Sequence, residues 1–233
     1  MKKLRYDKAI FEESFSYARM KLYFDRYPKN EQKAIRHYEQ SIRLAESLTP
    51  ALSVFEVTLR NAIIRELEKM TGRKDWYVSF QSNPSLHSLC KYIRTACAHI
   101  SNRGENITAD KINGELTLGF WVSLFNSEYE RLLWKNLRLA FPNMPKRQRQ
   151  RKNISAPLNS IRSLRNRVFH NESIGWSLTR LTELHDSIVQ VVFWMNADLP
   201  EWLRRGDRFH IVSRNVKIAR YGVLEFLRWG GVF

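Results

Sequence analysis

The stretch from Ser155 to Asn171 reads SAPLNSIRSLRNRVFHN and carries an informative helical pattern. Its apolar residues recur every three or four positions, which is the spacing of a helix with one buried face. These residues are Leu158, Ile161, Leu164 and Val168. Ser155 is a residue type that caps helix starts, and the pattern ends near Asn171. The stretch therefore predicts an amphipathic helix that packs one face against the rest of the chain.

The same spacing recurs on both sides of this helix, while strand signals are scarce. Further helices are expected at about residues 30–48, 50–70, 85–100, 108–125, 128–141 and 178–196, with Asn30, Thr49–Pro50 and Ser177 at helix starts and Gly72 after a helix end. Residues 201–205 look helical, whereas Arg208–Val212 can form an extended segment. The prediction is an all-α bundle, with a helical domain over residues 1–199 and a C-terminal extension over residues 200–233 that packs on the core or on a partner subunit.

Composition narrows the class of protein. The chain has 233 residues, which is long enough to bury a core without disulfides or metals. It has two cysteines, no apolar run long enough to cross a bilayer, and a charged opening sequence where a signal peptide would have an apolar centre. We therefore expect a cytoplasmic protein with no membrane partner and no cofactor, and composition argues against a disordered chain or a disulfide scaffold.

Charge points to a polyanionic partner. There are 39 Lys and Arg against 23 Asp and Glu, giving a formal net charge of +16. Such a charge attracts nucleic acid. The densest basic run is expected to be a loop, and it lacks the large apolar residues of a membrane-surface helix. Its candidate RNA-binding residues are Lys146, Arg147, Arg149, Arg151 and Lys152. A solvated basic loop without a ligand is the alternative.

The end of the 155–171 helix carries the candidate chemistry. Asn166 and His170 are four residues apart and share an exposed face, while Arg165 lies about 140° around the helix from His170 and has a long side chain. An arginine can bind phosphate in a bidentate manner, and a histidine in the last turn of a helix is favoured as imidazolium and can move a proton. Together they suit metal-free RNA cleavage by the substrate's own 2′-hydroxyl. Glu172 is a candidate to orient the His170 ring. A surface Arg and His that serve only electrostatic stability fit the same spacing.

Three segments, in order, carry a resemblance to a known family. Residues 55–63 read FEVTLRNAI, residues 115–125 read ELTLGFWVSLF, and residues 164–172 read LRNRVFHNE. The last contains RNRVFH, which matches the RX4-6H motif of HEPN-superfamily ribonucleases. Over about residues 15–195 the chain resembles the Abi-like abortive-infection family, the AbiD and AbiF group. Leu118 stands where that family more often has Phe.

The resemblance implies a HEPN-type helical bundle that acts as an endoribonuclease toxin in phage defence. Carried onto this chain, Arg165 and His170 from both copies of a homodimer would form one composite catalytic site, with Asn166 holding the geometry of the motif. The products would be a 2′,3′-cyclic phosphate and a 5′-hydroxyl. The resemblance also implies a structured noncoding RNA that restrains the toxin.

Other functions suit some of the same residues. A non-catalytic module could use the basic surface and the Arg–His pair to hold a noncoding RNA, and a protein scaffold is a weaker alternative. His87, Cys90, Cys97 and His99 share one expected helix, but they lack a short CxxC pair, so we expect buried cysteines and no metal site. Phe120, Trp121 and Phe125 could stack on bases, although a core position is favoured because their segment is apolar.

Overall fold

The fold is all-α in a computed structural model that describes residues 7–216. These residues form twelve α-helices and four short 3-10 helices, and no strand occurs among them. The α-helices are α1 (Lys8–Phe15), α2 (Tyr17–Arg26), α3 (Glu31–Thr71), α4 (Tyr77–Gln81), α5 (His87–Asn102), α6 (Ala109–Glu115), α7 (Leu118–Ser123), α8 (Glu130–Leu137), α9 (Arg151–Phe169), α10 (Leu178–Met195), α11 (Leu199–Leu203) and α12 (Phe209–Asn215). The 3-10 helices are η1 (Pro84–Leu86), η2 (Ser127–Tyr129), η3 (Arg138–Ala140) and η4 (Lys146–Gln148). The predicted all-α class is confirmed.

The chain divides into two compact units. The first contains residues 7–50, 163–186 and 206–216, and the second contains residues 51–162 and 187–205. Three of the four divisions fall inside the long helices α3, α9 and α10, and the fourth lies between α11 and α12. The domain boundary predicted at residue 199 stays a prediction, and residues 217–233 of the predicted extension lie outside the described residues.

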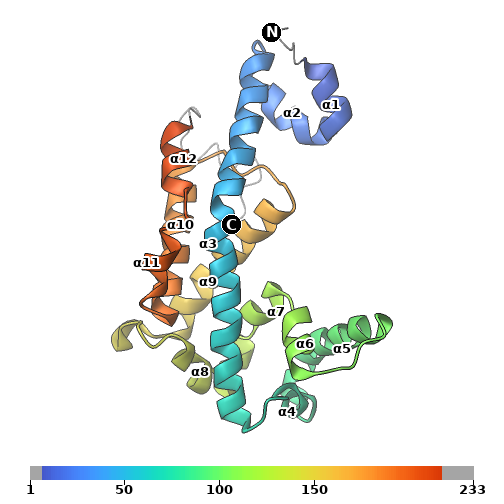
Figure 1. The fold of residues 1–233 in the computed structure, drawn as a ribbon, viewed down its shortest axis with the longest axis vertical. Coiled ribbons are helices and arrows are strands. Elements are labelled where there is room, and N and C mark those ends of the chain that lie inside the picture. The colour runs from blue at the N-terminus through green and yellow to red at the C-terminus, as the bar shows by residue number, and fades with distance from the viewer. Residues whose placement is uncertain (1–6, 217–233) are drawn as a thin grey trace. The chain divides into compact units, whose positions relative to one another are not determined.

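In the first unit, α1 and α2 lie beside the N-terminal part of α3 (Figure 1). Aromatic residues dominate the core that they share. This core consists of Met20, Tyr23, Phe24, Tyr27, Ala34, Ile35, Tyr38 and Trp176. Trp176 follows α9 in the chain, and its ring centroid lies 5.1 Å from that of Tyr23. The core therefore ties the segment after α9 to α2 and α3, which matters for the candidate site.

In the second unit, α4, α5 and α6 form one cluster with the C-terminal part of α3 and with α7 (Figure 1). Trp76 lies in its core, where its indole N–H donates to the Asn113 side chain at 3.1 Å and its ring packs on Phe120 and Trp121. Phe120 and Trp121 are 0% and 1% exposed. Both are therefore core residues, as their apolar surroundings predicted, and neither offers a surface on which a base could stack.

Three predicted helix ends are confirmed by their capping interactions. The Asn30 side chain accepts from the Lys33 N–H at 2.9 Å, and the Ser177 hydroxyl accepts from the Arg180 N–H at 3.2 Å. Gly72 follows α3 with φ of +69°, a left-handed conformation that a glycine adopts without steric cost. A capping side chain bonds to the backbone of its own turn, and a glycine adopts the left-handed conformation itself. Both signals are local, so sequence alone locates such helix ends well.

The helix break predicted at Thr49–Pro50 is wrong, because α3 continues through Pro50. An interior proline removes one hydrogen bond and costs about 3 kcal/mol. The Thr49 hydroxyl donates back to the Ala45 carbonyl at 3.2 Å instead of capping a new helix. Leu48 and Leu52, one on each side of the proline, are 0% and 1% exposed. Burial on both sides of Pro50 thus outweighs the local penalty.

Other boundaries differ from the predictions. The helix expected over 108–125 is two helices, because Leu116 is extended and the Thr117 hydroxyl then accepts from the Phe120 N–H at 3.4 Å to begin α7. The helix expected over 128–141 is α8 flanked by two 3-10 turns. Arg208–Val212, expected to extend, contributes to helix α12. Helices α1 and α2 were not predicted; they meet at Ser16, whose φ is +72°.

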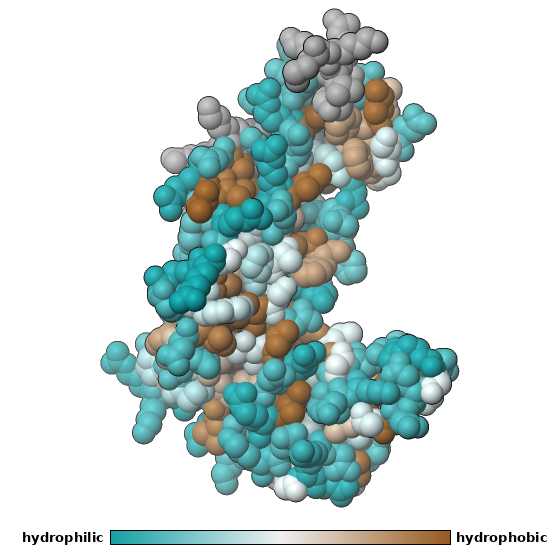
Figure 2. Space-filling model, viewed as in Figure 1, coloured by the Kyte–Doolittle hydropathy of each residue, from teal (hydrophilic) through white to brown (hydrophobic). Residues whose placement is uncertain are grey.

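On the face shown in Figure 2, hydrophilic residues predominate and hydrophobic ones are scattered between them. Within residues 7–216, no helix combines sufficient length with a sufficiently apolar run to span a bilayer.

Candidate functional site

Helix α9 buries the apolar stripe that the sequence predicted. Leu158, Ile161 and Leu164 are 0% exposed, and Val168 is 7% exposed. The helix begins at Arg151, four residues before the expected cap at Ser155, and Pro157 lies inside it. Pro157 lies beyond the first turn of the helix, so its missing N–H removes one intrahelical hydrogen bond. The buried stripe fixes the rotation of α9 and so decides which residues at its end face outward.

The end of α9 has the geometry of a Schellman motif. The Asn171 N–H donates to the Val168 carbonyl at 3.2 Å, and the Glu172 N–H donates to the Arg167 carbonyl at 2.8 Å. Asn171 has φ of +53°, a left-handed conformation that Asn tolerates better than most residues. The helix therefore ends abruptly, and His170 lies between its last helical residue and the left-handed turn.

Contacts from α2 and α3 hold the segment that follows this turn. The Arg19 guanidinium donates to the Asn171 carbonyl, and the Tyr23 hydroxyl is 2.6 Å from the Ser173 hydroxyl. His37 Nε2 donates to the Gly175 carbonyl at 3.0 Å, since a carbonyl can only accept. Burial lowers the pKa of His37, which keeps the ring neutral. Backbone hydrogen bonds at the turn and contacts from α2 and α3 after it therefore hold the end of α9 in place.

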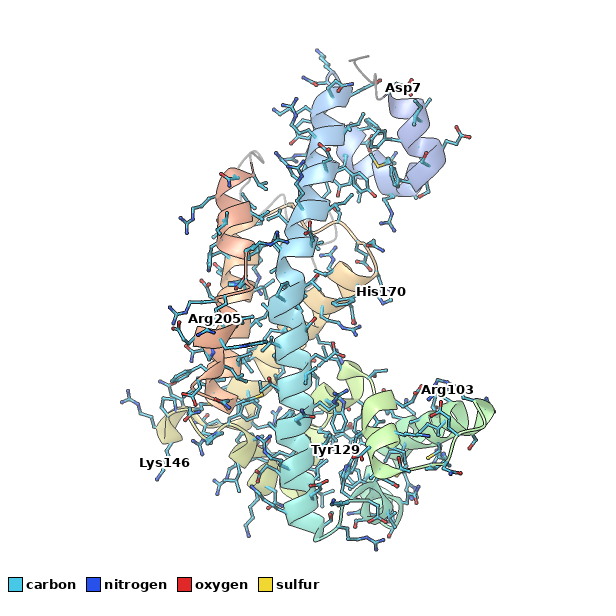
Figure 3. All side chains as sticks on the ribbon, viewed as in Figure 1. Asp7, Arg103, Tyr129, Lys146, His170 and Arg205 are labelled. Carbon is cyan, nitrogen blue, oxygen red and sulfur yellow. The ribbon has the colours of Figure 1, made fainter. Side chains whose placement is uncertain are left out.

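His170 and Asn166 are exposed and belong to the same face of α9. The His170 N–H donates to the Asn166 carbonyl at 2.9 Å, which continues the helical bonding by one residue. Neither side chain has a hydrogen-bond or ion-pair partner among residues 7–216. Figure 3 shows His170 at the end of α9. Both side chains are therefore available to a ligand.

Arg165 is partly buried and packs along the last turn of α9. Its guanidinium carbon lies 4.7 Å from the centroid of the Phe169 ring, within the range of a cation–π contact. Residues four apart on a helix are neighbours, so this contact holds the guanidinium near the end of the helix. The structure thus places all three residues of the predicted catalytic set in the same two turns.

Glu172 makes no hydrogen bond or ion pair with the His170 ring. Its carboxylate accepts from Arg167 Nε at 3.2 Å, and its backbone N–H completes the Schellman motif. Glu172 and Arg167 therefore stabilise the turn beside His170.

A cavity of about 880 Å³ lies beside the end of α9. Its lining includes Phe169 and Asn171 from this region and Tyr38 from α3. The charged lining residues are Glu13, Arg19, Glu46 and Glu172, so carboxylates outnumber cations three to one. Its volume suits a group such as a nucleoside. Because a phosphate would be repelled by these carboxylates, we expect any phosphodiester to lie on the His170 face and not in the cavity.

The basic run at residues 146–152 is not the simple loop that was expected. Lys146–Gln148 form η4, and Arg151 and Lys152 already belong to α9. Arg149 donates to the carbonyls of Pro142 and Met144, both at 2.7 Å. Arg151 donates to Glu130 at 2.7 Å and to the Phe125 carbonyl at 3.0 Å.

The predicted RNA-binding residues therefore separate into two kinds. Arg149 and Arg151 are partly buried and hold the backbone of the second unit together. Lys146, Arg147 and Lys152 are exposed, and the Lys146 side chain points outward in Figure 3. Only these last three can meet a phosphate without breaking an internal contact.

The candidate zinc ligands of α5 do not assemble. Cys90 is buried, its thiol donates to the Phe80 carbonyl at 3.4 Å, and burial raises its pKa. Cys97 is only partly buried, so the expectation of buried cysteines holds for Cys90 alone. His99 pairs with Glu115 at 2.9 Å. Within the described part of the chain, one group of possible metal ligands lies close together, and it consists of His185, Asp186 and His210. Reasoning from sequence missed it, because His210 is far from the other two along the chain.

Comparisons with family models, with curated proteins and with solved structures give no match to this chain. The family assignment therefore stays a prediction that rests on the three segments quoted above. In the structure, residues 55–63 belong to α3, residues 115–125 span α7, and residues 164–172 form the end of α9.

Proposed function

We propose that this chain is a metal-independent endoribonuclease of the Abi-like, HEPN type that acts in abortive infection. The observation that supports this most directly is the end of α9, where exposed His170 and Asn166 share a face beside Arg165 on a rigidly terminated helix. A catalytic histidine needs both solvent access and a fixed backbone, and this position offers both. The net charge of +16 supports RNA as the substrate class.

The proposed reaction is transesterification within RNA. The 2′-hydroxyl gives its proton to an imidazole, its oxygen bonds to the adjacent phosphorus, and the bond from phosphorus to the 5′-oxygen breaks. The 5′-oxygen takes a proton from an imidazolium. The products are a 2′,3′-cyclic phosphate and a 5′-hydroxyl. Arg165 stabilises the charge that develops on the phosphorus oxygens, and Asn166 keeps the motif in register.

A homodimer is part of this proposal, because the two proton transfers need one base and one acid. Two His170 side chains, one from each copy, supply both roles. A structured noncoding RNA is the proposed restraining partner, since a basic surface that binds substrate RNA also binds such a partner.

The proposal is tested by incubating the full chain with total RNA in excess EDTA. We expect cleavage by the wild type and a loss of about 100-fold or more for His170→Ala, the scale of general acid–base catalysis. Arg165→Lys should lose about 100-fold as well, because it keeps the charge and removes the planar fork. His87→Ala is the matched control, since His87 is an exposed histidine in the other unit.

A DNA of the same sequence should stay intact, because it lacks the 2′-hydroxyl. Cleavage that persists in His170→Ala, or that requires Mg²⁺, would contradict the proposal. Mixing wild type with His170→Ala tests the composite site: a mixed dimer has only one His170, so activity should fall with the square of the wild-type fraction. A fall in direct proportion to the wild-type fraction would show that each copy works alone.

The alternative, a module that binds a noncoding RNA without cleaving it, is favoured by the exposed cations Lys146, Arg147 and Lys152. Each phosphate contact to a single strand contributes about 0.7 to the slope of log affinity against log salt. Changing these three residues to Gln should therefore lower that slope by about 2. Intact RNA bound with a salt slope that depends on these residues would favour the module over the enzyme.

A further inference from the structure

His185 is a buried histidine that the proposed nuclease chemistry does not use. It lies on α10 and is 1% exposed. The Phe209 ring stacks on it with centroids 4.6 Å apart, and the His210 ring meets it edge-on at 4.7 Å. Phe209 and His210 are the first residues of α12, so His185 lies where α10 and α12 meet within the first unit.

Asp207 fixes the protonation pattern of the His185 ring. Its Oδ2 is 2.6 Å from His185 Nε2, and its Oδ1 accepts from the Phe209 N–H at 3.0 Å. The Asp207 side chain is only 7% exposed, so this carboxylate is held in place. A carboxylate can only accept, so Nε2 carries a proton, which leaves Nδ1 to bind a metal ion when the ring is neutral. A carboxylate that orients a histidine in this way is characteristic of the outer shell of metal sites.

The second ring nitrogen, Nδ1, lies near two further potential ligands. His185 Nδ1 is 3.4 Å from Asp186 Oδ1, and that oxygen is 3.6 Å from His210 Nε2. The three ligand atoms all lie within 4.8 Å of one another. Ligands that bind zinc at about 2.0–2.1 Å in a tetrahedron are about 3.3 Å apart, so only a small movement would bring all three onto one ion.

We propose that His185, Asp186 and His210 bind one divalent metal ion of the zinc class, with Asp207 as the outer-shell carboxylate. Two imidazoles and one carboxylate are ligands that zinc, cobalt and nickel accept. Three protein ligands leave a fourth position for water. Bound metal would join α10 to the start of α12. This site is independent of the proposed nuclease, which is tested in EDTA.

The test uses the full chain without a histidine tag, stripped of metal with EDTA and then dialysed. Zinc is titrated by calorimetry, and cobalt is titrated by its visible absorption, which is more intense in four-coordinate than in six-coordinate sites. We expect one ion per chain. His210→Ala and Asp186→Asn should each weaken binding by at least about 10-fold, and Asp207→Asn by about 10- to 100-fold, because outer-shell partners contribute that much to metal affinity.

His210 and Asp186 are 48% and 61% exposed, so their variants should fold, and circular dichroism checks this. The matched controls are His87→Ala and Asp198→Asn, which remove an exposed histidine and an exposed aspartate elsewhere. Failure of the wild type to bind either metal would overturn the proposal and leave the cluster as a hydrogen-bond network. Loss of binding in His87→Ala but not in His210→Ala would assign the metal to α5 instead.

Discussion

The two ends of α9 use charged and polar side chains in opposite ways. At its start, Arg149 and Arg151 donate to main-chain carbonyls, and Arg151 also pairs with Glu130. At its end, the side chains of His170 and Asn166 face outward without hydrogen-bond partners among the described residues, and the backbone around them is fixed by other groups. The dense run of cations thus includes arginines with a structural role. His170 and Asn166 are more accessible to a ligand than these arginines.

This contrast separates residues that hold the fold from residues that can act on a ligand. A long side chain whose donors are satisfied inside the protein must break those bonds before it binds phosphate. A side chain on a rigid backbone with its polar atoms free makes new bonds at little cost. Three changes test this distinction through their effects on the free energy of unfolding.

Arg149→Ala should have the largest effect, because it removes both hydrogen bonds to the Pro142 and Met144 carbonyls. Hydrogen bonds from charged donors contribute about 1.5–3 kcal/mol, so we expect the free energy of unfolding to fall by about 2 kcal/mol in urea titrations. Arg147→Ala, at an exposed neighbour, should change it by less than about 0.5 kcal/mol. Equal effects of the two variants would mean that the internal contacts of Arg149 contribute nothing.

Asn171→Ala should have an intermediate effect at the other end of α9. A left-handed conformation costs an ordinary residue about 1–2 kcal/mol, and Asn tolerates it better, so we expect a loss of about 1 kcal/mol in the same urea titration. Asn171→Gly should be neutral or slightly stabilising, because glycine adopts positive φ freely. If both substitutions destabilise equally, the Asn171 side chain, and not its backbone conformation, is what matters.

The smallest effect should come from the titration of His37, since a single proton is involved. The pKa of this ring is lowered from 6.5 by burial, so as pH falls through 6.5 the unfolded chain binds the proton before the folded chain does. The contribution of neutral His37 to the free energy of unfolding is therefore fully present above pH 6.5. It declines as the pH falls toward the lower pKa that the ring has in the folded chain.

Urea titrations at pH 7.5 and at stepwise lower pH would measure this decline. His37→Gln keeps a donor for the Gly175 carbonyl and cannot titrate, so its stability should depend less on pH. His87→Ala, which changes an exposed histidine, should keep the wild-type pH dependence. A wild-type pH dependence in His37→Gln would assign the effect to another group.

Helix positions were predictable where the signal is local. Asn30 and Ser177 cap helices through bonds to residues three positions on, and the stripe of α9 follows from its spacing alone. Thr117 could have been recognised as a cap of the same kind, which would have separated α6 from α7. The continuation of α3 through Pro50 was not predictable in this way. It depends on the burial of Leu48 and Leu52, and burial depends on the whole fold.

The candidate site was predictable in part for the same reason. Arg165, Asn166 and His170 lie within two turns of one helix, so their spacing already places them together. The role of Glu172 was not predictable, because its carboxylate could reach either His170 or Arg167 from the same position in the chain. The contribution of a second copy of the chain to this site belongs to the proposed function.

Sequence alone determined the helical class, the buried face of α9 and the order of polar residues at its end, because these depend on neighbours within one or two turns. Only the tertiary structure decided that Arg149 and Arg151 are structural and that His185 and Asp186 meet Asp207 and His210. Those contacts join different helices or loops, and they form because burying apolar surface brings distant segments together, which no local pattern encodes.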